Sequence, residues 1–286
     1  MNIEVRLLLT LVAVAEEGTF TDAAIRLGVS QAAVSRAIAR LESIVARRLV
    51  DRTTRHVTLT AAGTRAIEHA RAIIAEMDAL ERTMSTDQGQ LRLGYAWAAL
   101  GRYTTDVLAA WQGLHPGTEL SLVLTSSRTA GLLERRCDAA VMRRPIDDAR
   151  IDGVLVGMEH RYAALPAADP LARRRRISLT DLAGRTIAVD TVTGTTSLAM
   201  WPQAARPKAI RETQGVDEWL TVIEAGMAVG ITAEATRHQH PRAGVVFRRV
   251  ADAAPMPVTL AWRRSDPPTQ LADLIAVIVD AYAPSA

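Results

Sequence analysis

The sequence has only one cysteine, Cys137, among its 286 residues. A single cysteine excludes an internal disulfide and a disulfide-based redox switch, and no Cys/His cluster has the spacing of a zinc site. We interpret Cys137 as a small side chain in a packed segment. The same shortage of ligands leads us to expect neither a metal ion nor a cofactor.

Long apolar runs and enzyme motifs are also missing. No apolar run reaches about 18 residues, the length of a membrane-spanning helix, and the N-terminus lacks a signal-peptide pattern. There is no Gly-x-Ser-x-Gly elbow, no phosphate-binding Gly-x-x-x-x-Gly-Lys loop and no metal-binding histidine pair. The nearest pair, His238 and His240, lies in a polar stretch before Pro241. We therefore expect a soluble, cytoplasmic protein without enzymatic activity.

Positive charge is present, and it is concentrated in one part of the chain. The formal net charge is only +3, but residues 21–65 hold eight arginines and three acids, whereas residues 1–20 hold one arginine and three acids. A local excess of this kind is typical of a nucleic-acid surface, although a solvated helix face would also produce it. With 286 residues the chain is long enough for two or three domains, and 49% apolar residues are enough to give them buried cores.

The run from Thr19 to Glu42 predicts two short helices joined by a tight turn. Thr21 and Ser30 are the expected N-caps, because their hydroxyls can accept hydrogen bonds from the first free backbone N–H groups. Gly28 stands where the first helix must end in a left-handed conformation. A helix–turn–helix of this layout places its second helix in the major groove of DNA.

The second helix is predicted from Gln31 to about Val45, with an apolar face that repeats every three or four residues. At about 100° per residue the polar side chains point the opposite way. The outward face that we expect to meet DNA consists of Gln31, Ala32, Ser35, Arg36 and Arg40.

Residues 52–60 alternate in a way that suggests a small hairpin, or wing, with Arg52 and Arg55 near its tip. Thr60 is then expected to cap a long helix that ends at about Met84. Along that helix, side chains repeat at 4-3-4-3-4 spacing, the pattern of a two-helix coiled coil, and the alternative is packing against its own domain. The expected dimerisation positions are Ala66, Ala70, Ile73, Met77, Leu80 and Met84.

From Leu91 onward, short apolar runs alternate with helical stretches, which favours an α/β domain with largely parallel sheets. In such sheets, ligands bind beyond the carboxyl ends of the strands. The candidate effector-binding residues at these ends are Ala96, Trp97, Thr125, Ser126, Arg128, Arg143, Thr193, Thr195 and Trp262. We interpret the arginine run at 173–176 as a solvated loop or helix turn rather than a nucleic-acid patch.

Several motifs between Gly18 and Gly63 together resemble the N-terminus of LysR-type transcriptional regulators. They are Gly18-Thr-Phe-Thr-x-Ala-Ala-x-x-Leu27, Val29-Ser-Gln-x-Ala-Val-Ser-Arg36, Ile38-x-x-Leu-Glu42, Leu49-x-x-Arg52-Thr and Leu59-Thr-x-x-Gly63. Weaker similarity to the family's effector domain continues in Asp169-Pro-Leu171, Asp181-Leu-Ala-Gly184 and Glu224-Ala-Gly-Met-Ala-Val-Gly-Ile-Thr232.

The resemblance implies a regulator of transcription that binds operator DNA as a homodimer or homotetramer. It implies a winged helix-turn-helix domain at 1–59, a linker and dimerisation helix at 60–84, a hinge at 85–90 and an effector domain at 91–286. The effector domain would have two α/β subdomains like a periplasmic binding protein, about 91–163 with 264–286 and about 164–263. By the same similarity, Gln31, Ser35, Arg36, Arg52 and Arg55 match the DNA-reading positions.

The sequence departs from the family pattern at Ala32, Ala46 and Val50, where the family often has Pro, Gly and Phe. Ala46 favours a recognition helix that runs on past this point. Alanine and tryptophan follow the first strand, where the family often has hydroxyls. This change suggests an apolar or aromatic effector, with Arg128 and Arg143 holding a carboxylate. The alternatives are a small-molecule binding module without a DNA role and, less favoured, an enzyme on the α/β half.

Overall fold

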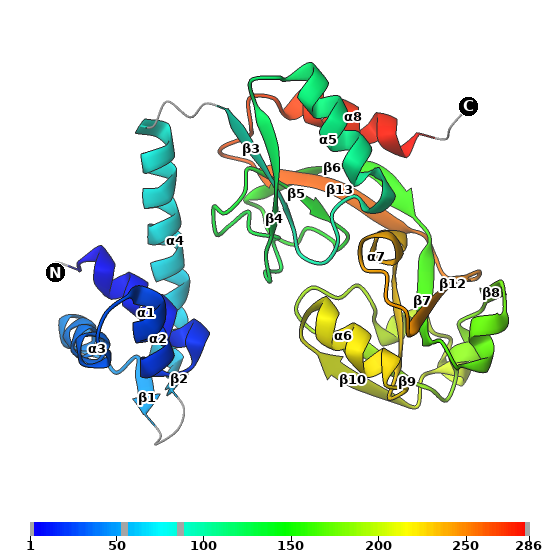
Figure 1. The fold of residues 1–286 in the computed structure, drawn as a ribbon, viewed down its shortest axis with the longest axis horizontal. Helices are drawn as coiled ribbons and strands as arrows, with labels where there is room; N and C mark the ends of the chain where they lie inside the picture. Colours follow the sequence, from blue (N-terminus) through cyan, green and yellow to red (C-terminus); the bar gives the residue numbers. More distant parts are fainter. Residues whose placement is uncertain (1–2, 53–56, 85–88, 284–286) are drawn as a thin grey trace. The chain divides into compact units, whose positions relative to one another are not determined.

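The computed structural model describes residues 3–52, 57–84 and 89–283, without the side chains of residues 52, 75, 78, 79 and 81–84. The chain divides into two compact units, residues 1–88 and 89–286 (Figure 1). No helix among the described residues is long and apolar enough to cross a membrane.

The first unit packs three short helices and a hairpin against a long helix (Figure 1). Its elements are α1 (Val5–Glu17), α2 (Phe20–Leu27), α3 (Gln31–Val45), β1 (Val50–Arg52), β2 (Val57–Leu59) and α4 (Ala61–Met84). The strands β1 and β2 pair antiparallel, so the predicted wing is confirmed. One apolar core joins these elements, and its most deeply buried side chains are Leu7, Leu11, Val14, Val34, Ile38 and Leu41.

The helix α2 begins earlier than the sequence reading placed it. Thr19, and not Thr21, is its N-cap: Oγ1 of Thr19 accepts a hydrogen bond from the Asp22 N–H at 3.0 Å and donates to the Asp22 carboxylate at 2.6 Å. A threonine followed three residues later by an acidic residue has the spacing of a capping box, and here the Asp22 carboxylate accepts its hydrogen bond from the Thr19 hydroxyl. The caps at Ser30 and Gly28 are confirmed.

The helix α3 ends at Val45, so the expectation that it runs on past Ala46 is wrong. Ala46 adopts the left-handed conformation with φ 51°, and the N–H groups of Ala46 and Arg47 close on the carbonyls of Ser43 and Glu42. This is the Schellman arrangement, formed here without glycine. The Glu42 carboxylate then accepts hydrogen bonds from the N–H groups of Leu49 and Val50, which fixes the start of the wing to α3.

The long helix α4 begins as predicted, with Thr60 accepting a hydrogen bond from the Gly63 N–H at 3.0 Å. Ala70 is completely buried and Ala66 is half-buried against the core of their own unit, so these two positions are already occupied. In contrast, three positions of the predicted seam are exposed apolar side chains, namely Ile73, Met77 and Leu80. The side chain of Met84 lies outside the described residues.

The second unit contains two sheets. The first subdomain is a five-stranded sheet with the order β4-β3-β5-β13-β6 and the helices α5 (Thr104–Leu114) and α8 (Leu271–Tyr282). Its strands are β3 (Gln90–Tyr95), β4 (Glu119–Leu124), β5 (Ala139–Met142), β6 (Ile151–Glu159) and β13 (Met256–Arg263). In the described chain, α5 and α8 lie side by side over this sheet (Figure 1).

The second subdomain is a six-stranded sheet with the order β10-β9-β11-β7-β12-β8 and the helices α6 (Gly215–Glu224) and α7 (Glu234–Gln239). Its strands are β7 (Arg161–Pro166), β8 (Arg176–Ile177), β9 (Thr186–Asp190), β10 (Ala209–Thr213), β11 (Val229–Ala233) and β12 (Val245–Val250). Short 3-10 helices lie at Gly101–Tyr103, Pro170–Arg173, Thr180–Leu182, Leu198–Met200 and Gln203–Ala205.

Both sheets are mixed, which corrects the expectation of largely parallel sheets. The strands β6, β7 and β12 each pair antiparallel with a neighbour. The strand β13 lies between β5 and β6 in the first subdomain. The chain therefore returns to the first subdomain before Met256, and the second subdomain ends earlier than the expected boundary at residue 263.

Candidate functional site

The outward face of α3 carries polar side chains that the protein leaves available. Gln31, Ala32 and Arg36 are exposed, and Ser35 is half-buried. Within the described residues, the guanidinium of Arg36 has no hydrogen bond or ion pair to the protein. Arg40 is also exposed, but its Nη2 lies 2.5 Å from the carboxylate of Glu4 at the start of α1. Among the described residues, four of the five predicted positions on α3 thus have no side-chain hydrogen bond or ion pair, and the fifth, Arg40, is held by an ion pair.

The strands of the wing are described, but the side chains of its two predicted DNA-binding arginines are not. Its backbone pairs Arg52 with Val57 and Val50 with Leu59, and the Val57 N–H also donates to the Gly18 carbonyl at 2.9 Å. These contacts attach the hairpin to the turn between α1 and α2. The side chain of Arg52 and the whole of Arg55 lie outside the described residues, so their predicted contact with DNA stays a prediction.

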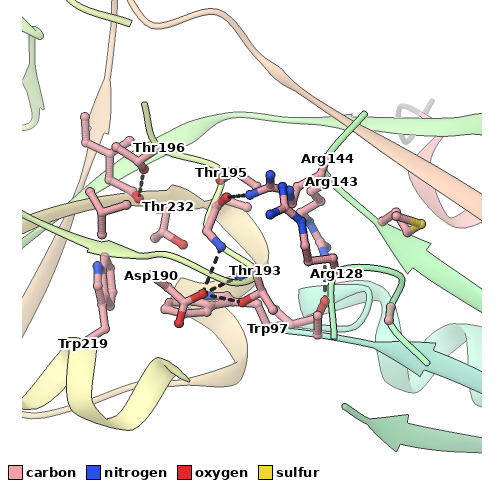
Figure 2. A pocket seen from close by; sticks show the side chains of 18 of the residues that line it. Trp97, Arg128, Arg143, Arg144, Asp190, Thr193, Thr195, Thr196, Trp219 and Thr232 are labelled. Atoms are coloured by element: carbon pink, nitrogen blue, oxygen red, sulfur yellow. Dashed lines mark hydrogen bonds between the residues drawn. The ribbon is translucent and has the colours of Figure 1, made fainter. Parts of the chain in front are cut away.

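A cleft lies between the two subdomains of the second unit (Figure 2). Its walls come from the segments after β3, β4 and β5 on one side and from β9, β11, α6 and the loop after β9 on the other. The free space inside is only about 60 Å³. Figure 2 shows arginines grouped on one side of the cleft, namely Arg128, Arg143 and Arg144.

Six of the nine candidate effector residues line this cleft: Ala96, Trp97, Arg128, Arg143, Thr193 and Thr195. Three do not. Thr125 is buried beside the cleft, and Ser126 is exposed outside it. Trp262 pairs with Ala139 at the amino end of β5, because β13 runs antiparallel and carries its carboxyl end away from the cleft.

Arg143 lines the cleft, but its guanidinium is fully committed to the protein. It forms an ion pair with Glu159 at 2.7 Å and donates to the carbonyls of Ala98 and Ala99, each at 2.6 Å. The exposed fractions of the Arg143 and Glu159 side chains are 8% and 4%. The expectation that Arg143 holds an effector carboxylate is therefore corrected, because a buried carboxylate of the protein already occupies it.

The Glu159 carboxylate ties several elements together. Besides Arg143, it accepts hydrogen bonds from the Tyr282 hydroxyl at 2.7 Å and from the Ala235 N–H at 3.2 Å. Burial on its own would raise the pKa of Glu159, but Arg143 and the hydrogen bonds outweigh it and hold the pKa below its ordinary value. Glu159 thus stays ionised and links β5, α7 and α8 at the junction of the subdomains.

Asp190 shapes the loop that faces the cleft from the second subdomain. Its carboxylate accepts hydrogen bonds from the N–H groups of Thr193, Gly194 and Gly215, at 2.5, 3.1 and 2.6 Å, and from the Thr193 hydroxyl at 3.0 Å. Burial favours a raised pKa, but these donors outweigh it and lower the pKa of Asp190. Thr195 is left with a hydroxyl that has no hydrogen-bond partner in the described part of the chain.

Trp97 crosses the cleft. It follows β3 in the first subdomain, yet its ring packs edge-on against Trp219 of α6 at 5.5 Å between centroids. Its indole Nε1–H donates to the Thr236 hydroxyl of α7 at 3.0 Å. The aromatic residue at this strand end therefore fills space between the subdomains, which explains why the cleft is so narrow.

Sequence reasoning missed several lining residues. Asp190 is the last residue of β9 and Arg144 lies two residues after β5, so the rule applied to the other candidates would have found both. Ser127 and Thr196 lie next to named candidates in the segments after β4 and β9, and Thr232 lies near the carboxyl end of β11, so the same rule covers them. Trp219, in α6, depends on contacts distant in sequence and carried no local signal. No group of three or more metal-ligating side chains occurs within the ranges that the structure covers.

The models of two domain families match this chain, one in each unit. Residues 5–64 match "Bacterial regulatory helix-turn-helix protein, lysR family", and residues 85–283 match "LysR substrate binding domain". The helix-turn-helix match covers α1 to the start of α4, and the second match covers both subdomains.

Among curated proteins, the chain is similar to the HTH-type transcriptional regulator ShiR of Corynebacterium glutamicum (strain R). The two are 36% identical over 191 residues, which is 63% of this chain and 63% of ShiR. It is 37% identical over 180 residues to a probable hydrogen peroxide-inducible genes activator of Mycobacterium avium, covering 60% of this chain and 57% of that protein. Each match spans less than two thirds of the relative's length.

Among solved structures, the fold is similar to that of CbnR, a LysR family transcriptional regulator. The TM-score is 0.68 at 22% sequence identity, covering 98% of this chain and 100% of that chain. Full-length CbnR in complex with its target DNA gives a TM-score of 0.58 at 23% identity, with the same coverage. At this level of identity the likeness is one of fold.

Proposed function

The chain belongs to the LysR family of bacterial helix-turn-helix regulators, and we propose that it is a DNA-binding transcriptional regulator switched by a small-molecule effector. The observation that carries this proposal is the outward face of α3. That face is held by capped helix ends and a buried apolar face, and its polar side chains other than Arg40 have no hydrogen bond or ion pair among the described residues. On this proposal the protein acts on the chromosome, in the cytoplasm.

In the proposed complex α3 lies in the major groove and the wing follows the phosphate backbone. Gln31, Ser35 and Arg36 face the base edges, where an arginine can donate two hydrogen bonds to a guanine. Arg40 is positioned by Glu4 and is assigned to a phosphate, since its ion pair fixes the guanidinium at the edge of the helix face. The small side chain of Ala32 lets the helix backbone approach the DNA closely and adds no polar group. Arg52 and Arg55 supply charge at the wing.

The operator is expected to be dyad-symmetric, because the exposed part of α4 offers a surface to a second copy. Ile73, Met77 and Leu80 are 46%, 39% and 61% exposed and lie on one stripe of the helix. A stripe of this kind is poorly placed in water and well suited to a two-helix seam. We assign dimerisation to these three side chains, and a tetramer would use a further contact between dimers.

The effector is proposed to be a small acid with an apolar or aromatic body. Because Arg143 is committed to Glu159, the carboxylate falls to Arg128, which is exposed at the cleft, and to the free hydroxyl of Thr195. Trp97 and Trp219 provide the apolar wall. The effector would bind and leave unchanged, since no catalytic role is proposed for the cleft.

Cys137 is not proposed as a peroxide sensor, although one relative is named as a probable peroxide-inducible activator. Its side chain has no exposed surface, and its thiol donates to the Ala130 carbonyl at 3.3 Å. Burial raises the pKa of the Cys137 thiol to about 12, so the reactive thiolate is scarce at neutral pH.

The test has two parts. DNase footprinting on the intergenic DNA beside the protein's own gene should give a protected, dyad-symmetric site. Thermal melting with small aromatic and aliphatic carboxylates should then show a rise in Tm with one class, lost in Arg128→Ala and kept in the exposed control Arg136→Ala. Absence of any protected site would contradict the regulator proposal, whereas a footprint without a stabilising acid would contradict only the effector class.

A further inference from the structure

A second hollow lies on the second subdomain, at the edge strand β8, and arginines dominate its lining. Its free space is about 440 Å³, far more than the cleft holds. The arginines come from three separate parts of the chain: Arg173, Arg174, Arg175 and Arg176 before and in β8, Arg237 in α7, and Arg248 and Arg249 in β12. We call this the arginine hollow.

The sheet register explains why these residues meet. Arg249 of β12 is paired with Tyr162 of β7 on one side and with Arg176 of β8 on the other. Directly paired residues point to the same face of a sheet, so the three side chains form a row across three strands. Arg237 of α7 extends this row, because its guanidinium stacks over the Tyr162 ring at 5.3 Å.

The protein neutralises little of this charge. Arg174 pairs with Asp181 at 2.8 Å, and Arg248 donates to the Ala172 carbonyl at 2.8 Å. The guanidinium of Arg249 lies 3.2 Å from His160 Nδ1, which adds no negative charge. The exposed side chains of Arg173, Arg175 and Arg176 have no hydrogen bond or ion pair within the ranges that the structure covers.

We propose that the arginine hollow binds a small polyanion that carries a chain of phosphate groups. Guanidinium groups bind phosphate oxygens through paired, charge-assisted hydrogen bonds, and several arginines around one hollow suit several adjacent phosphates. The site lies apart from the cleft and shares no lining residue with it. Arginines 173–176 are exposed, as expected of a solvated loop or helix turn, and they also line a hollow built from distant segments.

The shape of the site favours a small ligand over duplex DNA. DNA phosphates are best met by a convex or extended basic surface, such as a helix or a wing, that follows the backbone. Here the charges converge from a strand edge, a helix and a neighbouring strand on one open hollow, with the Tyr162 and Phe247 rings in its lining. A compact ligand can contact arginines from all three segments at once.

Calorimetric titration of the full chain with sodium tripolyphosphate, at low and fixed ionic strength, tests the proposal. Binding should saturate near one ligand per chain and should be at least about tenfold tighter than binding of orthophosphate, because more charge-assisted bonds form. Arg175→Gln with Arg176→Gln should weaken it by about tenfold or more. The matched control is Arg206→Gln with Arg211→Gln, two exposed arginines at the opposite edge of the same sheet, which should change affinity less than about twofold.

Arg237→Gln provides a second variant outside β8, in case the double change disturbs that short strand. Adenosine triphosphate in place of tripolyphosphate distinguishes the two sources of a phosphate chain: tighter binding indicates a nucleotide, and equal or weaker binding indicates the chain alone. The proposal is overturned if tripolyphosphate does not saturate, or if both double variants weaken it equally. It is also overturned if the β8 variant weakens DNA binding while tripolyphosphate binding is unchanged.

Discussion

The outward face of α3 and the cleft of the second unit use the same kinds of side chain in opposite ways. On α3, Arg36 is exposed and has no partner among the described residues. In the cleft, Arg143 is buried and meets one carboxylate and two carbonyls of the protein. The first arginine is available to a ligand, whereas the second is bound within the first subdomain, where it neutralises the carboxylate that reaches the Ala235 N–H of the second.

The difference follows from where each arginine lies. A side chain on the outer face of a surface helix is surrounded by water, so an added ligand replaces water only. A side chain at a strand end between two sheets is desolvated by the fold, and it is stable there only with a buried partner of opposite charge. Charge at a cleft therefore identifies a binding residue only after its partners in the protein are known.

The largest expected effect comes from breaking the buried pair. Arg143→Ala leaves the Glu159 carboxylate buried without its cation, which should cost about 3–5 kcal/mol in the free energy of unfolding. Urea unfolding followed by tryptophan fluorescence reports on this unit, because all five tryptophans lie between residues 97 and 262. Arg128→Ala, in the same cleft but exposed, is the matched control and should leave the midpoint nearly unchanged. Equal midpoints for both variants would contradict the comparison.

The second largest effect is expected on the outward face of α3, at the exposed Arg36. Arg36→Ala should cost about 1–3 kcal/mol in operator affinity if the guanidinium binds a base through two hydrogen bonds. It should leave the unfolding midpoint unchanged, because Arg36 is exposed and makes no hydrogen bond or ion pair with the described residues. Gel-shift titration on the footprinted site measures it, with Arg65→Ala on exposed α4 as the control. A loss of stability without a loss of affinity would make Arg36 a structural residue.

These two regions also differ in how far the sequence predicts them. The end of α2 at Gly28, the Ser30 cap and the outward face of α3 depend on contacts within about one or two helical turns, which a local pattern records. The expected cap at Thr21 is wrong for a local reason as well, because Thr19 and Asp22 form an N-cap pair within the same turn. The observed N-cap, Thr19, lies two residues before the predicted one.

The cleft depends on contacts that no local pattern records. Arg143 meets Glu159 across 16 residues and the Ala98 carbonyl across 45. Trp262 lies outside the cleft because β13 runs antiparallel to both of its neighbours, β5 and β6, and a local pattern does not record the order of strands in a sheet. The arginine hollow likewise joins residues 173–176 to positions more than 60 residues later. Strand ends locate a cleft, but only sheet order decides which side chains face it.

A smaller loss of stability is expected from changing Trp97, whose ring packs against Trp219 across the cleft. Trp97→Phe removes the indole hydrogen bond to Thr236 and part of the contact with Trp219, so the unit should lose about 1–2 kcal/mol of stability. Trp262→Phe is the control, since its indole makes no hydrogen bond in the described chain and lies outside the cleft. Urea unfolding followed by the remaining tryptophans measures both. An equal loss in the two variants would show that the bridge adds nothing beyond packing.

The smallest expected effect is a gain in the free energy of unfolding, and it concerns the turn that ends α3 at Ala46. Ala46 holds a left-handed conformation that disfavours any side chain, so Ala46→Gly should stabilise the first unit by about 0.5–1 kcal/mol, after the larger entropy loss of glycine is subtracted. Ala39→Gly, on the exposed face of the same helix, should destabilise it by about 1 kcal/mol. Because the first unit contains no tryptophan or tyrosine, helix circular dichroism is the readout. A loss of stability in Ala46→Gly would mean that the turn after α3 is held by its surroundings and not by local conformational preference.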